Sequence, residues 1–590
     1  MRTFFQSILG SCLGVLLAIL VIFLILAGIG SSIYSADRKK PKVKNNTVLH
    51  LKLDKITPEL TNNAQEIGIE YFMEQKKILS IHDYAQAIEK AAEDKNIKGI
   101  YLEPQGIRIG QTKREVLEDA ILKFKSSGKF VYAYADYYSG GAYQMATLAD
   151  QIAIFPQGGV DLRGIAAIVP HFKGLSEKLG VEFETYFAGK FKSATEPFRL
   201  EHMSDENKLQ TNSYLQSLYS EILMDITRNR SIDSISLQRV INEYSARNAQ
   251  LAKENGLVDL ILYKDEMLQF IKDKIGLKED EDINFITLDN YYTANPPKKD
   301  YTVKDKIAIL FAEGEIHDGP AASGTISGEE YPRIIREIRQ DKDIKALVVR
   351  IDSPGGSALA SEKVWRELKL TQEAGIPVVA SMGSYAASGG YYIASGTQHI
   401  IAEPSTITGS IGVFILFPKV GKLFSDKLGI NMDTVQTNQY SAAFTPFFPS
   451  SPGERQILQG EVDQIYETFL ERVAEARNMS RDQVNEVAQG RVWTGKQAIE
   501  KGLVDEMGDL QDALIKAAQL AEIDEYRITN YPRIKDPLYQ FLEQLTGEDF
   551  SAVTKVLQGD METFLQKKIE GSMNSWSGPQ TRMPINLLWD

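Results

Sequence analysis

The sequence predicts an α/β protein made of two tandem repeats with mostly parallel sheets, preceded by one N-terminal transmembrane helix. Two observations predict the repeats. Segments about 250 residues apart resemble each other, and short β-branched runs alternate with helical patterns inside each segment. Such alternation is typical of βαβ units, whose strands lie parallel. A third observation, an uncharged apolar run close to the N-terminus, predicts the membrane helix.

The apolar run extends from Ile8 to Ile33 without a charged residue, which is long enough to cross ~30 Å of hydrocarbon. A cleaved signal peptide is the alternative, although the apolar core of such signals is usually only ~7–15 residues long. We therefore expect residues 1–45 to form a membrane anchor with a basic flank. By the positive-inside rule alone, that flank would leave the large domains in the cytoplasm, because it contains Arg38, Lys39, Lys40, Lys42 and Lys44.

Composition restricts the kinds of protein that remain. The 590 residues are 43% hydrophobic and 25% charged, which are ordinary values for a folded protein of several domains. The net charge of −13 and the lack of a basic stripe argue against a nucleic-acid partner. The single cysteine, Cys12, rules out a disulfide framework and a cysteine metal cluster within one chain.

The internal repeat sets the expected domain boundaries. After the anchor we expect a first repeat at 46–300, a second at 301–530, and a C-terminal helical extension at 531–590. The linker YYTANPPKKD, which ends at Asp300, has the proline and charge expected between domains. The matching pairs of segments are 95–106 with 342–353, 128–156 with 375–404, and 180–198 with 429–447.

Glycine-rich loops follow three predicted strands of the second repeat, at 352–357, 384–392 and 405–413, and α/β proteins build their sites on such loops. Ser388 lies in the second of these loops, directly before Gly389 and a segment that can start a helix. A serine placed there can act as a nucleophile, because backbone N–H groups and the helix dipole stabilise a developing oxyanion. The alternative role for Ser388 is that of a helix cap.

The comparison between the repeats favours the nucleophile interpretation. The first repeat keeps Ser139 followed by two glycines, but it has PQGIR where the second has SPGGS. Only Ser388 is therefore accompanied by the paired glycines Gly355 and Gly356, one of which could donate a second N–H to an oxyanion alongside Gly389.

A serine nucleophile needs a base, and a lysine can serve if burial lowers its pKa. The repeat indicates Lys192, which follows Ser139 at the spacing that separates Ser441 from Ser388. Taken alone, Lys192 would be a solvated surface lysine. Lys190 competes with it, since strand alternation would put both lysines on one face. A distant histidine base also stays open, and the candidates in the same repeat are His317 and His399.

These residues resemble peptidase family S49 in its long, two-repeat signal peptide peptidase form, and the resemblance runs from the anchor to about residue 520. Members of this form carry a lysine in a KSA.EPF segment of the first repeat and a serine in an AASGGYY segment of the second. The matching residues here are Lys192 and Ser388. The family also has a serine in a TGSIG segment that contacts the lysine, and its match is Ser410. A turn-capping hydroxyl is the alternative role for Ser410.

The resemblance implies a crotonase/ClpP-like fold in each repeat and assembly into a homotetramer. It also implies cleavage of signal peptide remnants on the periplasmic side of the bacterial inner membrane, contrary to the charge that follows the anchor. The resemblance does not identify the natural substrates. Nor does it say whether lysine and serine meet within one chain or between subunits.

We therefore predict a membrane-anchored serine endopeptidase with a Ser/Lys dyad that degrades cleaved signal peptides and needs neither a metal ion nor an organic cofactor. An acyl-CoA hydratase or hydrolase of the same fold class is one alternative, because a fold alone does not fix a function. A non-catalytic membrane scaffold is the other.

Overall fold

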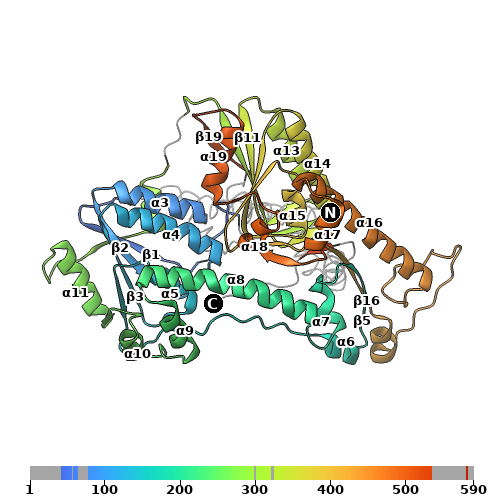
Figure 1. Ribbon diagram of the computed structural model, residues 1–590, viewed down its shortest axis with the longest axis horizontal. Helices are drawn as coiled ribbons and strands as arrows, with labels where there is room; N and C mark the ends of the chain where they lie inside the picture. The colour runs from blue at the N-terminus through green and yellow to red at the C-terminus, as the bar shows by residue number, and fades with distance from the viewer. Residues whose placement is uncertain are drawn as a thin grey trace, which may run out of the picture.

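The computed structural model describes residues 41–55, 57–63, 78–297, 301–320 and 324–533, together with the backbone of 580–582. This part of the chain forms two lobes, each built on its own sheet, and a third sheet to which both halves of the sequence contribute (Figure 1).

The first lobe contains a sheet in which all neighbouring strands are parallel. The strands lie in the spatial order β6 (Leu260–Ile261), β4 (Gln151–Ile154), β3 (Phe130–Ala135), β2 (Ile97–Glu103), β1 (Thr47–Lys52) and β7 (Asn284–Thr287). Helix α11 (Lys264–Ile275) packs on one face. The other face is covered by α3 (Ile81–Glu93), α4 (Gln111–Ser126), α5 (Gly140–Ala146), α9 (Ser234–Asn242), α10 (Ala249–Glu254) and α12 (Leu288–Ala294).

The second lobe has a mostly parallel sheet in the order β17 (Val492–Thr494), β15 (Ile407–Gly409), β13 (Val378–Ala387), β11 (Ile344–Ser353), β8 (Lys306–Glu313) and β19 (Arg527–Tyr531). Strand β14 (His399–Ala402) pairs with β13 and with β18 (Glu506–Met507). Helix α19 (Leu510–Leu520) covers one face. The core on the other face includes α13 (Glu330–Gln340), α14 (Ala358–Glu373), α15 (Gly389–Ala394), α16 (Pro452–Arg477), α17 (Arg481–Val487) and α18 (Gly495–Glu500).

The two lobes have the same topology. Reading across the sheets, β6-β4-β3-β2-β1-β7 of the first lobe corresponds to β18-β14-β13-β11-β8-β19 of the second. Strands such as β11 and β13 are buried along nearly their whole length, as continuous apolar runs in parallel sheets should be. The predicted α/β class with mostly parallel sheets and two repeats is confirmed.

The third sheet joins the halves. Its strands lie in the order β10 (Thr325–Ser327), β9 (Glu315–His317), β12 (Gly355–Ser357), β20 (Gln580–Arg582), β16 (Val413–Lys419) and β5 (Glu182–Ala188). Strand β5 comes from the first half of the sequence and pairs antiparallel with β16 along its whole length. This pairing carries the chain that follows β5 into the second lobe.

Helix α8 (Asp205–Arg230) also spans both halves, and in Figure 1 it runs from α7 below the second lobe to the first lobe. Its C-terminal part buries Ile222 and Ile226 in the first lobe's core. Nearer its start, Tyr214 packs with residues of β13, β15 and β17, and Ser217 Oγ lies 2.7 Å from Thr494 Oγ1. The helix therefore fixes the first lobe against the second.

A buried set of charges completes the contact between the halves. Arg350 of β11 is wholly buried, and its guanidinium donates to Glu59 from the first half at 3.0 Å and to Glu403 at 2.8 Å. The same Glu59 carboxylate lies 2.9 Å from His82 and 3.7 Å from Lys113. A buried pair is costly to break, because the charge left behind has no water to solvate it.

Short helical segments flank the third sheet: α6 (Lys173–Leu179), η1 (Ser193–Thr195), α7 (Glu196–Arg199) and η2 (Leu423–Leu428).

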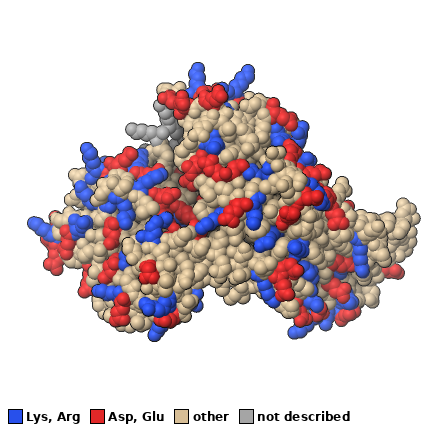
Figure 2. All heavy atoms as spheres, viewed as in Figure 1, with Lys and Arg blue, Asp and Glu red and all other residues tan. Residues whose placement is uncertain are grey.

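Lysine, arginine, aspartate and glutamate side chains are interspersed over the face drawn in Figure 2.

Two predicted features fall largely outside the described residues. The apolar run Ile8–Ile33 lies wholly outside them, and no helix that the structure describes is both long and apolar enough to span a bilayer. Of the predicted helical extension at 531–590, the structure describes only 531–533 and the strand β20. The domain boundaries at 300 and 530 stay predictions.

Candidate active site

Ser388 lies at the turn between β13 and α15 and has an unusual backbone. Its φ is 57° and its ψ is −115°, a combination that strains a residue with a β-carbon. The turn is held by a hydrogen bond from the Ser388 N–H to the Gly409 carbonyl at 2.8 Å, and the residue is fully buried. Strain of this kind is retained where the surrounding structure enforces it, and it is commonest at functional sites.

Lys192 reaches Ser388 from the first half of the sequence. It follows β5 in the turn that leads into η1, and only 1% of it is exposed. Its Nζ lies 2.7 Å from Ser388 Oγ, 2.9 Å from the Ser410 carbonyl oxygen and 3.1 Å from Ser410 Oγ. The structure therefore brings the three polar residues that the sequence singled out into one cluster.

Burial sets the protonation of this lysine. Desolvation lowers the pKa of the Lys192 ammonium well below its usual value, because a charged amine loses its hydration in the interior. Within the described part of the chain, no carboxylate pairs with Nζ to oppose that shift. A neutral amine next to a serine hydroxyl can accept its proton, which is what a general base requires.

Ser410 contacts the amine of Lys192 through two oxygen atoms. It lies between β15 and β16, has a φ of 51°, and donates its backbone N–H to the Arg491 carbonyl at 2.7 Å. With this geometry both its carbonyl and its hydroxyl face Lys192 Nζ.

A turn at Gln489 and Gly490, which the sequence did not reveal, supports the backbone next to both Lys192 and Ser410. The N–H of Phe191 donates to the Gln489 carbonyl at 2.8 Å, and the N–H of Gly490 donates to the Ile411 carbonyl at 2.7 Å. A β-carbon on Gly490 would come within 2.5 Å of the Lys192 backbone nitrogen, so only glycine fits there. The glycine in AQGRVW was a signal that could have identified this turn.

Gln210 of α8 is a second residue that the sequence did not reveal. Its amide nitrogen donates to the Phe191 carbonyl at 2.9 Å and to Ser193 Oγ at 3.0 Å, so it binds both neighbours of Lys192. Its oxygen accepts from the Val492 N–H at 3.2 Å. A single glutamine in a polar helix carries no pattern from which this role could be predicted.

The predicted oxyanion glycines belong to α15 and β12, two elements that contact each other. Gly389 is the first residue of α15, directly after Ser388, and Gly355 and Gly356 form the start of β12. The Gly355 N–H donates to Ser353 Oγ at 3.2 Å. At Gly356, where φ is 153°, a β-carbon would lie 1.9 Å from the Ile316 carbonyl oxygen. Their role toward an oxyanion stays a prediction.

The competing bases lie elsewhere. Lys190 is exposed, with its Nζ 5.2 Å from the centre of the Phe191 ring. Strand alternation does not relate it to Lys192, because β5 ends at Ala188 and both lysines lie in the turn beyond it. His317 contacts Thr325, and His399 pairs with Glu506.

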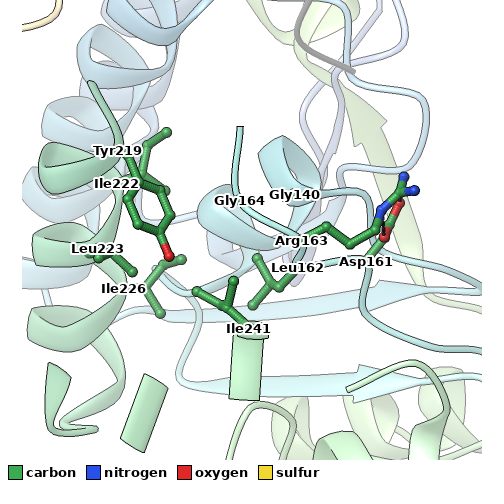
Figure 3. A pocket seen from close by; sticks show the side chains of 10 residues that line it. All are labelled: Gly140, Asp161, Leu162, Arg163, Gly164, Tyr219, Ile222, Leu223, Ile226 and Ile241. Atoms are coloured by element: carbon green, nitrogen blue, oxygen red, sulfur yellow. Dashed lines mark hydrogen bonds and ion pairs between the residues drawn. The ribbon is translucent and has the colours of Figure 1, made fainter. Parts of the chain in front are cut away.

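The corresponding place in the first lobe has a different character. Ser139 has a φ of −67° and accepts a hydrogen bond from the Ala142 N–H, as a helix cap does. Beside Gly140, Figure 3 shows an apolar pocket into which Leu162 and side chains of α8 and α9 point. At its edge Arg163 pairs with Asp161 at 2.6 Å.

No group of three or more histidine, cysteine, aspartate or glutamate side chains in the described ranges is arranged to hold a metal ion.

Comparisons with known proteins agree with the repeat. The model of "Peptidase family S49" matches residues 123–278 and again residues 371–524. "Protease 4" of Haemophilus influenzae is 36% identical over 75% of this chain and 73% of its own length. "Protease 4" of Salmonella typhi is 32% identical over 96% of this chain and 94% of its own length. "Serine protease SPPA, chloroplastic" of Arabidopsis thaliana is 32% identical over 84% of this chain and 75% of its own length.

Proposed function

The chain belongs to peptidase family S49, and on that premise we propose that it is a membrane-anchored serine endopeptidase with Ser388 as nucleophile and Lys192 as general base. The observation that carries the proposal is the 2.7 Å contact between a buried lysine amine and the hydroxyl of a strained serine. Family membership argues against the acyl-CoA hydratase and the non-catalytic scaffold.

In the proposed mechanism Ser388 Oγ attacks the carbonyl carbon of a peptide bond while Lys192 Nζ takes the hydroxyl proton. The carbonyl oxygen becomes an oxyanion, which N–H groups of Gly389 and of Gly355 or Gly356 would stabilise, each worth ~3 kcal/mol in comparable enzymes. The lysine ammonium then gives its proton to the leaving amine as the carbon–nitrogen bond breaks. Water hydrolyses the acyl-enzyme with the amine again acting as base.

Ser410 is a positioning residue in this proposal. Its carbonyl and hydroxyl oxygens hold Nζ toward Ser388, and the turn at Gly490 fixes the backbone on both sides. The base comes from the first repeat and the nucleophile from the second, so we propose that neither repeat is active alone. In this structure the two residues meet within one chain.

The remaining features rest on the family resemblance. We propose that each lobe has the crotonase/ClpP-like architecture and that residues 1–45 anchor the chain in the bacterial inner membrane, with the lobes in the periplasm. The proposed substrates are signal peptide remnants and similar membrane-derived peptides. No cofactor is required by this chemistry.

We also propose a homotetramer. Support comes from two segments, one half-exposed and one fully exposed, whose counterparts in the other repeat pair with each other. Residues 165–171 correspond to β16, and residues 431–437 correspond to β5, yet neither segment belongs to a strand that the structure describes. Ile168 and Val435 in these segments are almost completely exposed. Pairing between two copies would reproduce the β16–β5 contact.

Active-site labelling tests the nucleophile directly. The full-length protein in detergent is treated with a fluorophosphonate probe, and the modified residue is mapped by mass spectrometry. We expect label on Ser388, slower labelling in Lys192→Ala, and wild-type labelling in Ser139→Ala, which changes the corresponding serine of the other repeat. Label on another residue, or an unchanged labelling rate in Lys192→Ala, would contradict the dyad.

A further inference from the structure

The third sheet contains a strand from the far C-terminal end of the sequence. Strand β20 pairs antiparallel with β12, placing Gly355 opposite Arg582, Gly356 opposite Thr581 and Ser357 opposite Gln580. On its other side it pairs antiparallel with β16, where Phe414 is opposite Gln580. It also lies against α15, the helix that begins directly after Ser388.

The strands on either side of β20 carry the parts of the candidate active site. Strand β12 starts with the two glycines predicted to bind the oxyanion. Strand β16 begins three residues after Ser410, and its partner β5 ends four residues before Lys192. The backbone of 580–582 therefore lies in extended form between the oxyanion strand and the strand that positions the base.

Removing β20 would leave a gap one strand wide. Strand β12 has β9 on its other side and β16 has β5, so β20 alone bridges the two parts of this sheet. Two facing strand edges offer backbone N–H and carbonyl groups to any extended peptide, independently of its side chains. A protease needs such a place, because an extended peptide presents its carbonyl carbon to the nucleophile in a fixed orientation.

We propose that residues 580–582 occupy the position of a peptide substrate and act as an internal competitor that limits access to Ser388. This inference rests on the proposed peptidase function and adds its regulation. Strand β20 pairs with both β12 and β16, so a second extended chain could not pair with the same two edges while β20 is in place. A tethered competitor acts at an effective concentration in the ~mM range, so it can oppose peptides that bind with modest affinity.

Proline at the centre of β20 provides the kinetic test. Thr581→Pro removes a backbone N–H from the strand, while Thr581→Val keeps the N–H and serves as the matched control. In the full-length protein we expect Thr581→Pro to lower the KM for a reporter peptide about fivefold or more with kcat nearly unchanged. Thr581→Val should behave as the wild type.

A synthetic peptide of residues 578–584, GPQTRMP, should raise the KM of Thr581→Pro again, and a scrambled peptide should not. Equal KM values for Thr581→Pro, Thr581→Val and the wild type would overturn the internal competitor.

A second test does not depend on catalysis. In a Cys12→Ser background, the pair Ser357→Cys with Gln580→Cys places two thiols at directly opposed positions of β12 and β20. The control pair Ser357→Cys with Arg582→Cys is offset by two residues and has the same change in β12. We expect mild oxidation to cross-link the first pair far more completely than the control, and reduction to restore peptide cleavage.

The two hypotheses fail differently. Equal cross-linking of both pairs would show that β20 does not occupy this position in solution. Selective cross-linking of the first pair supports the placement of β20 even if no reduced variant cleaves peptides, in which case the proposed peptidase function is the part that fails.

Discussion

Ser139 and Ser388 occupy the same place in two lobes of the same topology, and each precedes two glycines and a short helix. The backbone distinguishes them. Ser139 has an ordinary extended conformation and caps its helix, whereas Ser388 has a positive φ, makes no capping bond and directs its hydroxyl at Lys192. An identical Ser-Gly-Gly motif can therefore be a structural cap in one repeat and a candidate nucleophile in the other.

The lysine shows the reverse distribution. Lys192 of the first repeat is buried against the second, while its counterpart Ser441 is exposed in a turn. Each lobe thus supplies one half of the candidate dyad. Two copies of the fold therefore form one candidate site between them. The contact between the lobes is part of that site.

The largest expected effect compares the two serines. Ser388→Ala should lower kcat/KM for a small-residue peptide ester by about 10³-fold or more, because the nucleophile is lost. Ser139→Ala should leave kcat/KM within about twofold of the wild-type value, since the loss of a helix cap in the first lobe does not alter Ser388 or Lys192. Steady-state kinetics on the purified full-length variants measures both. A similar loss in the two variants would mean that the first repeat has a site of its own.

The second effect concerns the charges that join the lobes. Arg350→Met leaves Glu59 and Glu403 buried without their partner and should lower the free energy of unfolding by about 3–5 kcal/mol. Glu103 is the counterpart of Arg350 in the first repeat, and it contacts His50 at 2.5 Å and the exposed Lys264 at 2.7 Å within its own lobe. Glu103→Gln removes the charge but keeps the side chain's size and its hydrogen-bonding oxygen, so it should cost less than Arg350→Met, about 1–2 kcal/mol. Thermal unfolding of both variants tests this prediction. Equal losses of stability would mean that the charges between the lobes contribute no more than the ion pairs of Glu103.

The third effect is a pH dependence. Burial lowers the pKa of Lys192, so between that value and the unfolded value of 10.5 the unfolded chain binds one more proton than the folded chain. The wild type then gains stability as pH rises through this window. Lys192→Met has no such proton, and at neutral pH we expect its Tm to exceed that of the wild type by about 2–4 °C.

The advantage of Lys192→Met should shrink toward pH 10.5, as scanning calorimetry at several pH values would reveal. The matched control is Ser441→Lys, which places a lysine at the exposed counterpart and should leave the Tm nearly unchanged at every pH. A Tm difference between Lys192→Met and the wild type that stays constant with pH would mean that the buried amine does not titrate as proposed.

The smallest effect is the cap itself. Ser139→Ala removes the acceptor for the Ala142 N–H and should cost about 1 kcal/mol of stability. Ser388→Ala removes no cap and should not show this loss. Denaturant unfolding measures the stability of both variants. An equal loss of stability would mean that Ser139 and Ser388 do not differ in capping their helices.

Much of the fold was predictable because it repeats. Strands such as β11 and β13 are continuous apolar runs, and the helices between them follow the 3.6-residue pattern, so the class and the two lobes could be read from sequence. The family resemblance pointed to Lys192, Ser388 and Ser410 before any geometry was known. The choice between Lys190 and Lys192 could not be made from spacing, because it depends on where β5 ends.

Other parts had no local signal. Gln210 stabilises the backbone around Lys192 from a long helix, and Glu59 meets Arg350 across nearly half of the sequence. Such contacts depend on how two lobes dock, which no short motif encodes. The pairing of β20 with β12 is of the same kind, since it joins residues more than 200 positions apart in the chain.

The sequence by itself determined the α/β class, the two repeats and the candidates Ser388 and Lys192, because periodic apolar patterns and repeated motifs are local properties of the chain. Ser410 followed only from the family resemblance. The tertiary structure alone decided that Lys192 is buried next to Ser388, that Ser388 is strained while Ser139 is a cap, and that 580–582 lie between β12 and β16. Burial and backbone strain are set by the whole fold, and they turn a lysine and a serine into a candidate base and nucleophile.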